Sequence, residues 1–140
     1  MKYDELMSII PKEQLDAVFA YEKCDIDAEF LGFTKVYKQL SSIIPKHFIV
    51  IDLGCAYASQ CYYFTKHRQY IGVEIEPCVQ FHTENTKHYH MSIQKFIGDE
   101  LPKMNLNLEK VFAICSYVPD VRARELVRNT FPNVFTFYPA

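Results

Sequence analysis

Five short apolar runs alternate with more polar segments along the last two thirds of the chain. In Phe48–Leu53 and Lys110–Tyr117 the apolar residues follow one another with few interruptions, as they do in strands that are covered on both faces of a sheet. The runs at Tyr70–Glu74, His88–Ser92 and Asn133–Tyr138 predict three further strands. We therefore expect five strands, each separated from the next by a helical or irregular segment.

The polar intervals predict helices, because apolar residues recur in them at helical spacing and proline or capping residues mark their ends. Pro11 suits the first turn of one helix, and Pro45 ends a second one that begins near Asp27. Asp120 can accept hydrogen bonds from the unpaired N–H groups that begin a later helix. The expected helices follow Pro11 and cover 27–42, 59–66, 77–85, 93–101 and 120–129, with a loop over 102–108.

Strands that alternate with helices at this spacing predict a parallel sheet with right-handed crossovers. We expect an α/β, Rossmann-like three-layer sandwich, in which a five-stranded sheet of order 3-2-1-4-5 carries helices on both faces. The 140 residues suit one domain, with N-terminal helices over 1–46 and the sheet and its helices over 47–140.

Polar side chains stand at the carboxyl ends of four of the predicted strands. They are Asp52, Glu74, Ser92 and Ser116. Ligands of such sheets bind beyond the carboxyl ends of the strands, where the strand order reverses between strands 1 and 4. The agreement among these positions predicts a ligand site at this edge of the sheet.

Composition narrows the kind of ligand and partner. The net charge is −2 with scattered Lys and Arg, so charge does not indicate nucleic acid. No apolar run approaches the ~20 residues of a membrane span, and the acidic start of the chain is unlike a signal peptide. The five cysteines form no CxxC pair, which is typical of reduced thiols in a cytoplasmic protein. His88 and His90 have no third ligand nearby in the sequence, so we expect no metal site.

The segment after the first strand contains small residues at alternate positions. Read as a dinucleotide fingerprint, its three glycine positions hold Gly54, Ala56 and Ser59. Ala56 would crowd a pyrophosphate, and the charge of Asp52 would repel it, so a nicotinamide or flavin cofactor is disfavoured. A tight turn without any ligand, with Asp52 as a helix cap, is the structural alternative.

The same segment resembles motif I of class I S-adenosylmethionine-dependent methyltransferases, in which an acid precedes x-Gly-x-Gly-x-Gly. Asp52 and Gly54 match, whereas Ala56 and Ala58 replace glycines. The resemblance covers about 30–138 and implies that S-adenosylmethionine is the cofactor. It assigns Asp52, Gly54, Cys55 and Ala56 to the cofactor-binding turn.

The resemblance also implies roles for residues after the second, third and fourth strands. It assigns Glu74 to the ribose hydroxyls and Ile75 to packing on the adenine. Ser92 and Ile93 take the place of an acid and an apolar residue, and the Ser92 hydroxyl can accept the bond of the adenine amino group more weakly than an acid. Tyr117 is the candidate for orienting a methyl acceptor or removing its proton, although an aromatic residue that only closes a strand end is the simpler interpretation.

The expected function is S-adenosylmethionine binding with methyl transfer to an acceptor that the sequence does not indicate. The family's last two strands have no counterpart before Ala140, which motivates an alternative. In that alternative the chain is a catalytically degenerate, methyltransferase-like binding or interaction protein. The fifth strand then lies at a sheet edge and is aromatic and uncharged, which predicts contact with a second copy or a protein partner.

Overall fold

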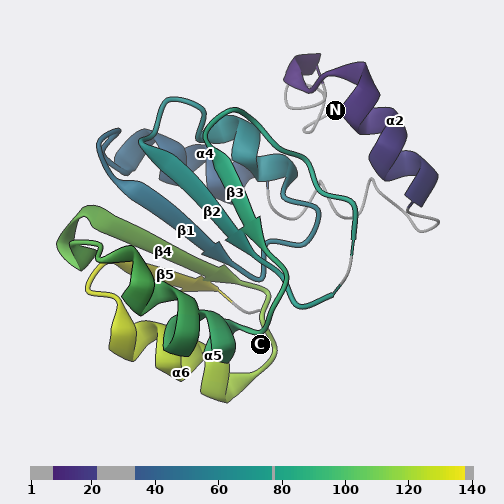
Figure 1. The fold of residues 1–140 in the computed structure, drawn as a ribbon. Helices are drawn as coiled ribbons and strands as arrows, with labels where there is room; N and C mark the ends of the chain where they lie inside the picture. The colour runs from purple at the N-terminus through teal and green to yellow at the C-terminus, as the bar shows by residue number, and fades with distance from the viewer. Residues whose placement is uncertain (1–7, 22–33, 77, 138–140) are drawn as a thin grey trace.

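The computed structural model describes residues 8–21, 34–76 and 78–137, and its centre is a parallel five-stranded sheet (Figure 1). The strand order β3-β2-β1-β4-β5 and the parallel pairing of all neighbours confirm the predicted α/β, Rossmann-like architecture. The strands are β1 (Ile49–Leu53), β2 (Gln69–Val73), β3 (Thr86–Tyr89), β4 (Val111–Ser116) and β5 (Val134–Phe137).

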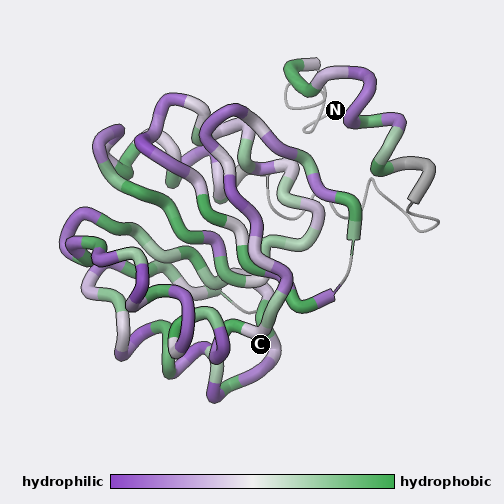
Figure 2. Tube along the Cα trace, in the orientation of Figure 1, coloured by the Kyte–Doolittle hydropathy of each residue, from purple (hydrophilic) through white to green (hydrophobic). Residues whose placement is uncertain are grey.

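The central strand β1 is buried along its whole length, and its side chains alternate between two cores. Val50 belongs to the core under α4 (Thr34–Ile43) and the 3-10 helix η1 (Ser59–Tyr63), whereas Ile51 belongs to the core under α6 (Val121–Thr130). In Figure 2 β1 is mostly hydrophobic, whereas the edge strand β3 is mostly hydrophilic. This difference follows from position, because only a central strand of a parallel sheet is covered on both faces.

The helices lie in the order that the sequence predicts, with differences in type and length. Asp120 caps α6 as expected, since its Oδ1 accepts hydrogen bonds from the backbone N–H groups of Arg122 and Ala123. The helix expected over 27–42 is described from Thr34 onward, as α4; its earlier part lies outside the described residues. The remaining helices are α2 (Lys12–Tyr21), α5 (Ile93–Lys95), the π-helix η2 (Phe96–Glu100), and the 3-10 helices η3 (Leu101–Met104) and η4 (Leu108–Lys110).

The helix predicted over 77–85 is wrong. Residues 78–83 have no regular secondary structure, because the polar groups of Gln80 and Phe81 bond to the turn after β1 and those of His82 bond to Gln14. The Phe81 N–H donates to the Tyr57 carbonyl at 2.8 Å, and Gln80 Nε2 donates to the Ala56 carbonyl at 2.7 Å. The Phe81 ring is also fully buried. Tertiary contacts therefore override the helical spacing of this segment.

Smaller corrections concern three other segments. The predicted helix 59–66 is the shorter η1, the predicted helix 93–101 is divided between α5 and η2, and the predicted loop 102–108 begins in η3. The third strand ends at Tyr89, so His90 and Ser92 follow the strand instead of lying within it. Among the described residues, no helix combines the length and the apolar character needed to cross a membrane.

Candidate functional site

The turn after β1 brings three residues into the left-handed region of backbone space. The φ angles are +81° at Gly54, +51° at Ala56 and +61° at Ala58. These are the positions at which the sequence has small residues in alternation. Left-handed backbone costs residues other than glycine roughly 1–2 kcal/mol because of their Cβ atom. Gly54 avoids this cost, whereas Ala56 and Ala58 both incur it.

Gly54 meets a second constraint. A Cβ atom at this position would lie 2.6 Å from Cγ2 of Val118. The Gly54 N–H donates to the Val73 carbonyl at 2.7 Å, and the Cys55 N–H donates to the same carbonyl at 3.1 Å. The turn is therefore held close against the end of β2 and against the segment that follows β4.

A cleft of about 360 Å³ opens at this carboxyl edge of the sheet, between the turn and the segments that follow β2 and β4. Its volume lies within the roughly 300–1,000 Å³ that small-molecule sites occupy. Its lining residues are Gly54, Ala56, Val73, Glu74, Ile75, Ile93, Ser116, Tyr117, Val118 and Pro119. The cleft therefore includes most of the residues predicted from the sequence, at the place where the strand order reverses.

Glu74 follows β2 directly and joins the two sides of the cleft. Its Oε1 accepts a hydrogen bond from the Ala56 N–H at 2.9 Å, and its Oε2 accepts one from the Glu76 N–H at 3.1 Å. The side chain is half-buried. An ionised carboxylate has about four acceptor sites, so Glu74 retains capacity for a ligand's hydroxyl groups.

Two isoleucines give the cleft apolar surface. Ile75 is 63% exposed although it is large and hydrophobic, whereas Ile93 is buried and lines the cleft from α5. Ser92 is not among the lining residues. Its hydroxyl oxygen caps α5 by accepting the Lys95 N–H at 3.0 Å, so one of its two lone pairs serves the fold.

Tyr117 lines the cleft in a strained conformation. Its φ is +58°, which is unusual for a bulky residue. The Tyr117 N–H donates to the Phe137 carbonyl at 2.7 Å, and the two rings meet edge to face at 5.2 Å. Strained residues gather at functional sites, and β5 holds this one in place.

Asp52 lies beneath the turn and does not line the cleft. It is fully buried, with three donors around its carboxylate. Tyr37 Oη donates to Oδ1 at 3.1 Å, while Gln60 Nε2 and Tyr70 Oη donate to Oδ2 at 2.8 and 2.5 Å. We refer to these four residues, together with Ser116, as the Asp52 network.

Burial raises the pKa of Asp52 from 3.8 to about 6, because the charged form loses its hydration. The three hydrogen bonds lower the pKa and offset part of this effect, and the negative charge of Glu74 raises it further. Asp52 is therefore mainly ionised at neutral pH and becomes protonated in mildly acidic solution.

Ser116 links the Asp52 network to the cleft. Its Oγ lies 2.7 Å from Tyr37 Oη, and the residue is both 4% exposed and part of the cleft lining. Sequence reasoning placed Ser116 at this edge but missed Tyr37, Gln60 and Tyr70. The strand periodicity contained a signal for Tyr70 alone, since it and Asp52 fall on the same face of adjacent strands in the register Val50–Tyr70 and Asp52–Gly72.

Cys55 is buried beside the turn and does not line the cleft. Its Sγ accepts a hydrogen bond from Gln80 Nε2 at 3.3 Å, and burial raises the pKa of the thiol well above its usual range. The residue predicted as part of the cofactor-binding turn therefore contributes packing, and through its N–H it fixes the turn to β2.

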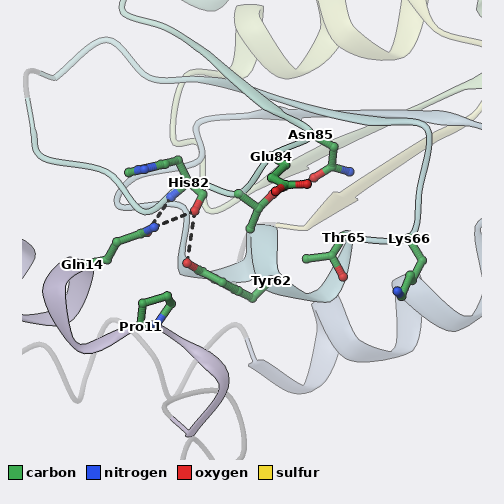
Figure 3. A pocket seen from close by; sticks show the side chains of 9 residues that line it. Pro11, Gln14, Tyr62, Thr65, Lys66, His82, Glu84 and Asn85 are labelled. Carbon is green, nitrogen blue, oxygen red and sulfur yellow. Dashed lines mark hydrogen bonds between the residues drawn. The ribbon is translucent and has the colours of Figure 1, made fainter.

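A second cavity, of about 710 Å³, lies between α2 and the segment 82–85 (Figure 3). Gln14 pairs with the backbone of His82 at both atoms, donating from Nε2 and accepting at Oε1, each at 2.9 Å. Tyr62 Oη donates to the same His82 carbonyl at 3.1 Å. The cavity shares no lining residue with the cleft, and these polar groups serve to attach α2.

Within the described ranges, no group of three or more His, Cys, Asp or Glu side chains is placed to hold a metal ion. His88 Nε2 lies 2.9 Å from the Phe81 carbonyl, which makes it part of the packing of the segment before β3. Comparison of the chain with family models, curated proteins and solved structures finds no match in any of the three. Function must therefore be argued from the site.

Proposed function

We propose that the chain binds S-adenosylmethionine in the cleft and transfers its methyl group to an acceptor. The observation that carries this proposal is the position of Glu74. An acidic side chain at the end of β2 lies in a cleft of suitable volume, with an exposed apolar residue, Ile75, directly after it. A carboxylate can accept both hydroxyls of a ribose, and an apolar surface beside it suits a purine ring.

The hydrogen bonds of the turn favour a ligand without phosphates. In dinucleotide sites the N–H groups at the start of a long helix meet the pyrophosphate. Here the Ala56 N–H donates to the Glu74 carboxylate, and the helix that follows the turn is a five-residue 3-10 helix. A pyrophosphate would meet a negative charge and an amide that is already engaged, whereas the cationic sulfonium and ammonium of S-adenosylmethionine would be attracted.

The described lining offers few groups for acid-base chemistry. Glu74 and Tyr117 are its titratable members. Methyl transfer depends mainly on in-line placement of the acceptor and the sulfonium, so this composition is compatible with catalysis. It also motivates the second candidate, a methyltransferase-like protein that binds the cofactor and acts through a partner.

Calorimetric titration with S-adenosylmethionine, S-adenosylhomocysteine and NAD tests the proposal. We expect the first two to bind and NAD not to bind. Failure of both sulfur compounds to bind would refute it, and tight NAD binding would favour the dinucleotide alternative. Transfer of a labelled methyl group to a panel of small-molecule, protein and RNA acceptors then separates the enzyme from the degenerate binding protein.

A further inference from the structure

The Asp52 network has a direction that follows from counting hydrogen atoms. A tyrosine hydroxyl has one hydrogen to donate. The geometry has Tyr37 Oη donating to the Asp52 carboxylate, which is the strongest acceptor within reach. The bond of 2.7 Å between Tyr37 Oη and Ser116 Oγ then needs the hydrogen of Ser116. When Asp52 is ionised, Ser116 therefore donates its hydrogen bond to Tyr37, and Tyr37 donates to Asp52.

This direction determines what Ser116 can offer to a ligand. With its hydrogen directed at Tyr37, the Ser116 oxygen has lone pairs left and no hydrogen to donate. A protonated Asp52 can instead donate to Tyr37 Oη, and Tyr37 then donates to Ser116. The Ser116 hydroxyl keeps its hydrogen, which no longer points at Tyr37 and can be donated to a ligand. No atom moves by more than a hydroxyl rotation, and one proton is taken up at Asp52.

We propose that Ser116 is a specificity-determining residue of the cleft, a hydrogen-bond acceptor for an N–H or O–H group of the ligand whose polarity is set by Asp52 through Tyr37. Asp52 and Tyr37 act as positioning residues, because they reach the ligand only through Ser116. The inference rests on the proposed function for its ligand, since S-adenosylmethionine carries N–H donors in its ammonium and adenine amino groups.

The surroundings of Asp52 make it the group that sets the state of the network near neutral pH. The groups that face it are Tyr37 from α4, Cys61 from η1, Cys55 from the turn, Tyr70 from β2, Glu74 after β2 and Cys115 from β4. Burial raises the pKa of each of these tyrosines and cysteines, so they stay neutral between pH 5 and 8. His88 lies beyond Gly72, and burial lowers its pKa.

The unliganded protein tests the link between Asp52 and Tyr37. Carbon-13 NMR would follow the Asp52 carboxyl carbon and the Tyr37 Cζ carbon from pH 5 to 8. We expect both signals to change with one common midpoint, and the Tyr37 change to be absent in Asp52→Asn. Either a Tyr37 signal that stays constant while Asp52 titrates, or an Asp52 that does not titrate in this range, would overturn the inference.

Calorimetry with S-adenosylmethionine tests the consequence for the ligand. We expect the affinity to fall about tenfold from pH 7.5 to 5, which is the effect of about 1.4 kcal/mol. Asp52→Asn can donate from its amide to Tyr37 and should bind at pH 7.5 as weakly as the wild type does at pH 5. Ser116→Ala should show no such pH dependence, and any pH dependence that remains in this variant arises outside the Asp52 network.

Tyr70→Phe is the matched control for Tyr37→Phe. Both tyrosines donate to Asp52, but only the Tyr37 hydroxyl reaches Ser116. We expect Tyr37→Phe to abolish the pH dependence and Tyr70→Phe to retain it. Equal loss in both variants, or pH-independent binding to the wild type, would overturn the inference. If S-adenosylmethionine does not bind the wild type at all, the proposed function fails, and the NMR experiment alone decides the direction of the network.

Discussion

Asp52 and Glu74 stand at the carboxyl ends of two neighbouring strands, and the sequence alone does not indicate that their surroundings differ. In the structure Asp52 is fully buried among three donors, whereas Glu74 is half-buried in a cleft and accepts hydrogen bonds from two backbone amides. The turn from Gly54 to Ala58 passes between them. Asp52 lies within β1, opposite Gly72, whereas Glu74 follows the last residue of β2. The comparison shows that the position of an acid along its strand, inside the sheet or just beyond its end, decides whether it is buried in the fold or open to a ligand.

The largest expected effect is on stability, and it comes from removing the buried carboxylate of Asp52. Asp52→Ala leaves Tyr37, Gln60 and Tyr70 without their acceptor, and each buried unsatisfied donor costs about 1–3 kcal/mol. We expect the free energy of unfolding to fall by roughly 3–5 kcal/mol, as measured by urea denaturation. Asp52→Asn keeps the shape and one oxygen, so its loss should be much smaller. Equal losses in the two variants would contradict the role of the hydrogen bonds.

The next largest effect is the pH dependence of stability that the raised pKa of Asp52 produces. A carboxyl group whose pKa is raised on folding binds protons more readily in the folded state, so its contribution to stability is present below pH 3.8 and is lost as the pH rises to about 6. A rise of about two pKa units corresponds to about 3 kcal/mol.

Urea denaturation of the wild type and Asp52→Asn from pH 4 to 7.5 checks this. The wild type should lose stability relative to the variant as the pH rises. The comparison with the variant is needed because burial lowers the pKa of His67 and His88, which acts in the opposite direction. A constant difference between the two proteins over this range would mean that Asp52 does not titrate as described.

On the open side of the turn, Glu74→Ala should affect the ligand more than the fold. The loss of a hydrogen bond to a charged group is worth about 1.5–3 kcal/mol, so we expect S-adenosylmethionine affinity to fall on the order of tenfold or more. Calorimetry measures this, with Glu76→Ala as the matched control because Glu76 is exposed and does not line the cleft. Unchanged affinity in Glu74→Ala would contradict the placement of the ligand.

The smallest expected effect lies in the turn itself. Ala56→Gly relieves a left-handed alanine, an effect that the greater freedom of glycine in the unfolded chain partly cancels. We expect a stability gain of up to about 1 kcal/mol in thermal or urea denaturation. Gly54→Ala is the opposite case, because its new Cβ would meet Val118. A loss of stability in Ala56→Gly would show that the turn is not strained.

The sequence predicts the sheet better than the site. Strand order and parallel pairing follow from apolar runs and from the handedness of crossovers, which are local signals combined with one general rule. The helix over 77–85 fails because Gln80 and Phe81 bond to the turn after β1. Likewise the partners of Asp52 lie up to 18 residues away in the chain, and no spacing rule predicts that Tyr37 would reach it from a helix.

The pairing of Gln14 with His82 offers a way to observe the attachment of α2. The side-chain amide of Gln14 bonds to both the N–H and the carbonyl of His82, as the backbone of a neighbouring strand would. The His82 N–H lies outside any strand and is nevertheless bonded, so its exchange with deuterium depends on the attachment of a helix 68 residues earlier in the chain. A single amide signal therefore measures how often the N-terminal helix leaves the sheet domain.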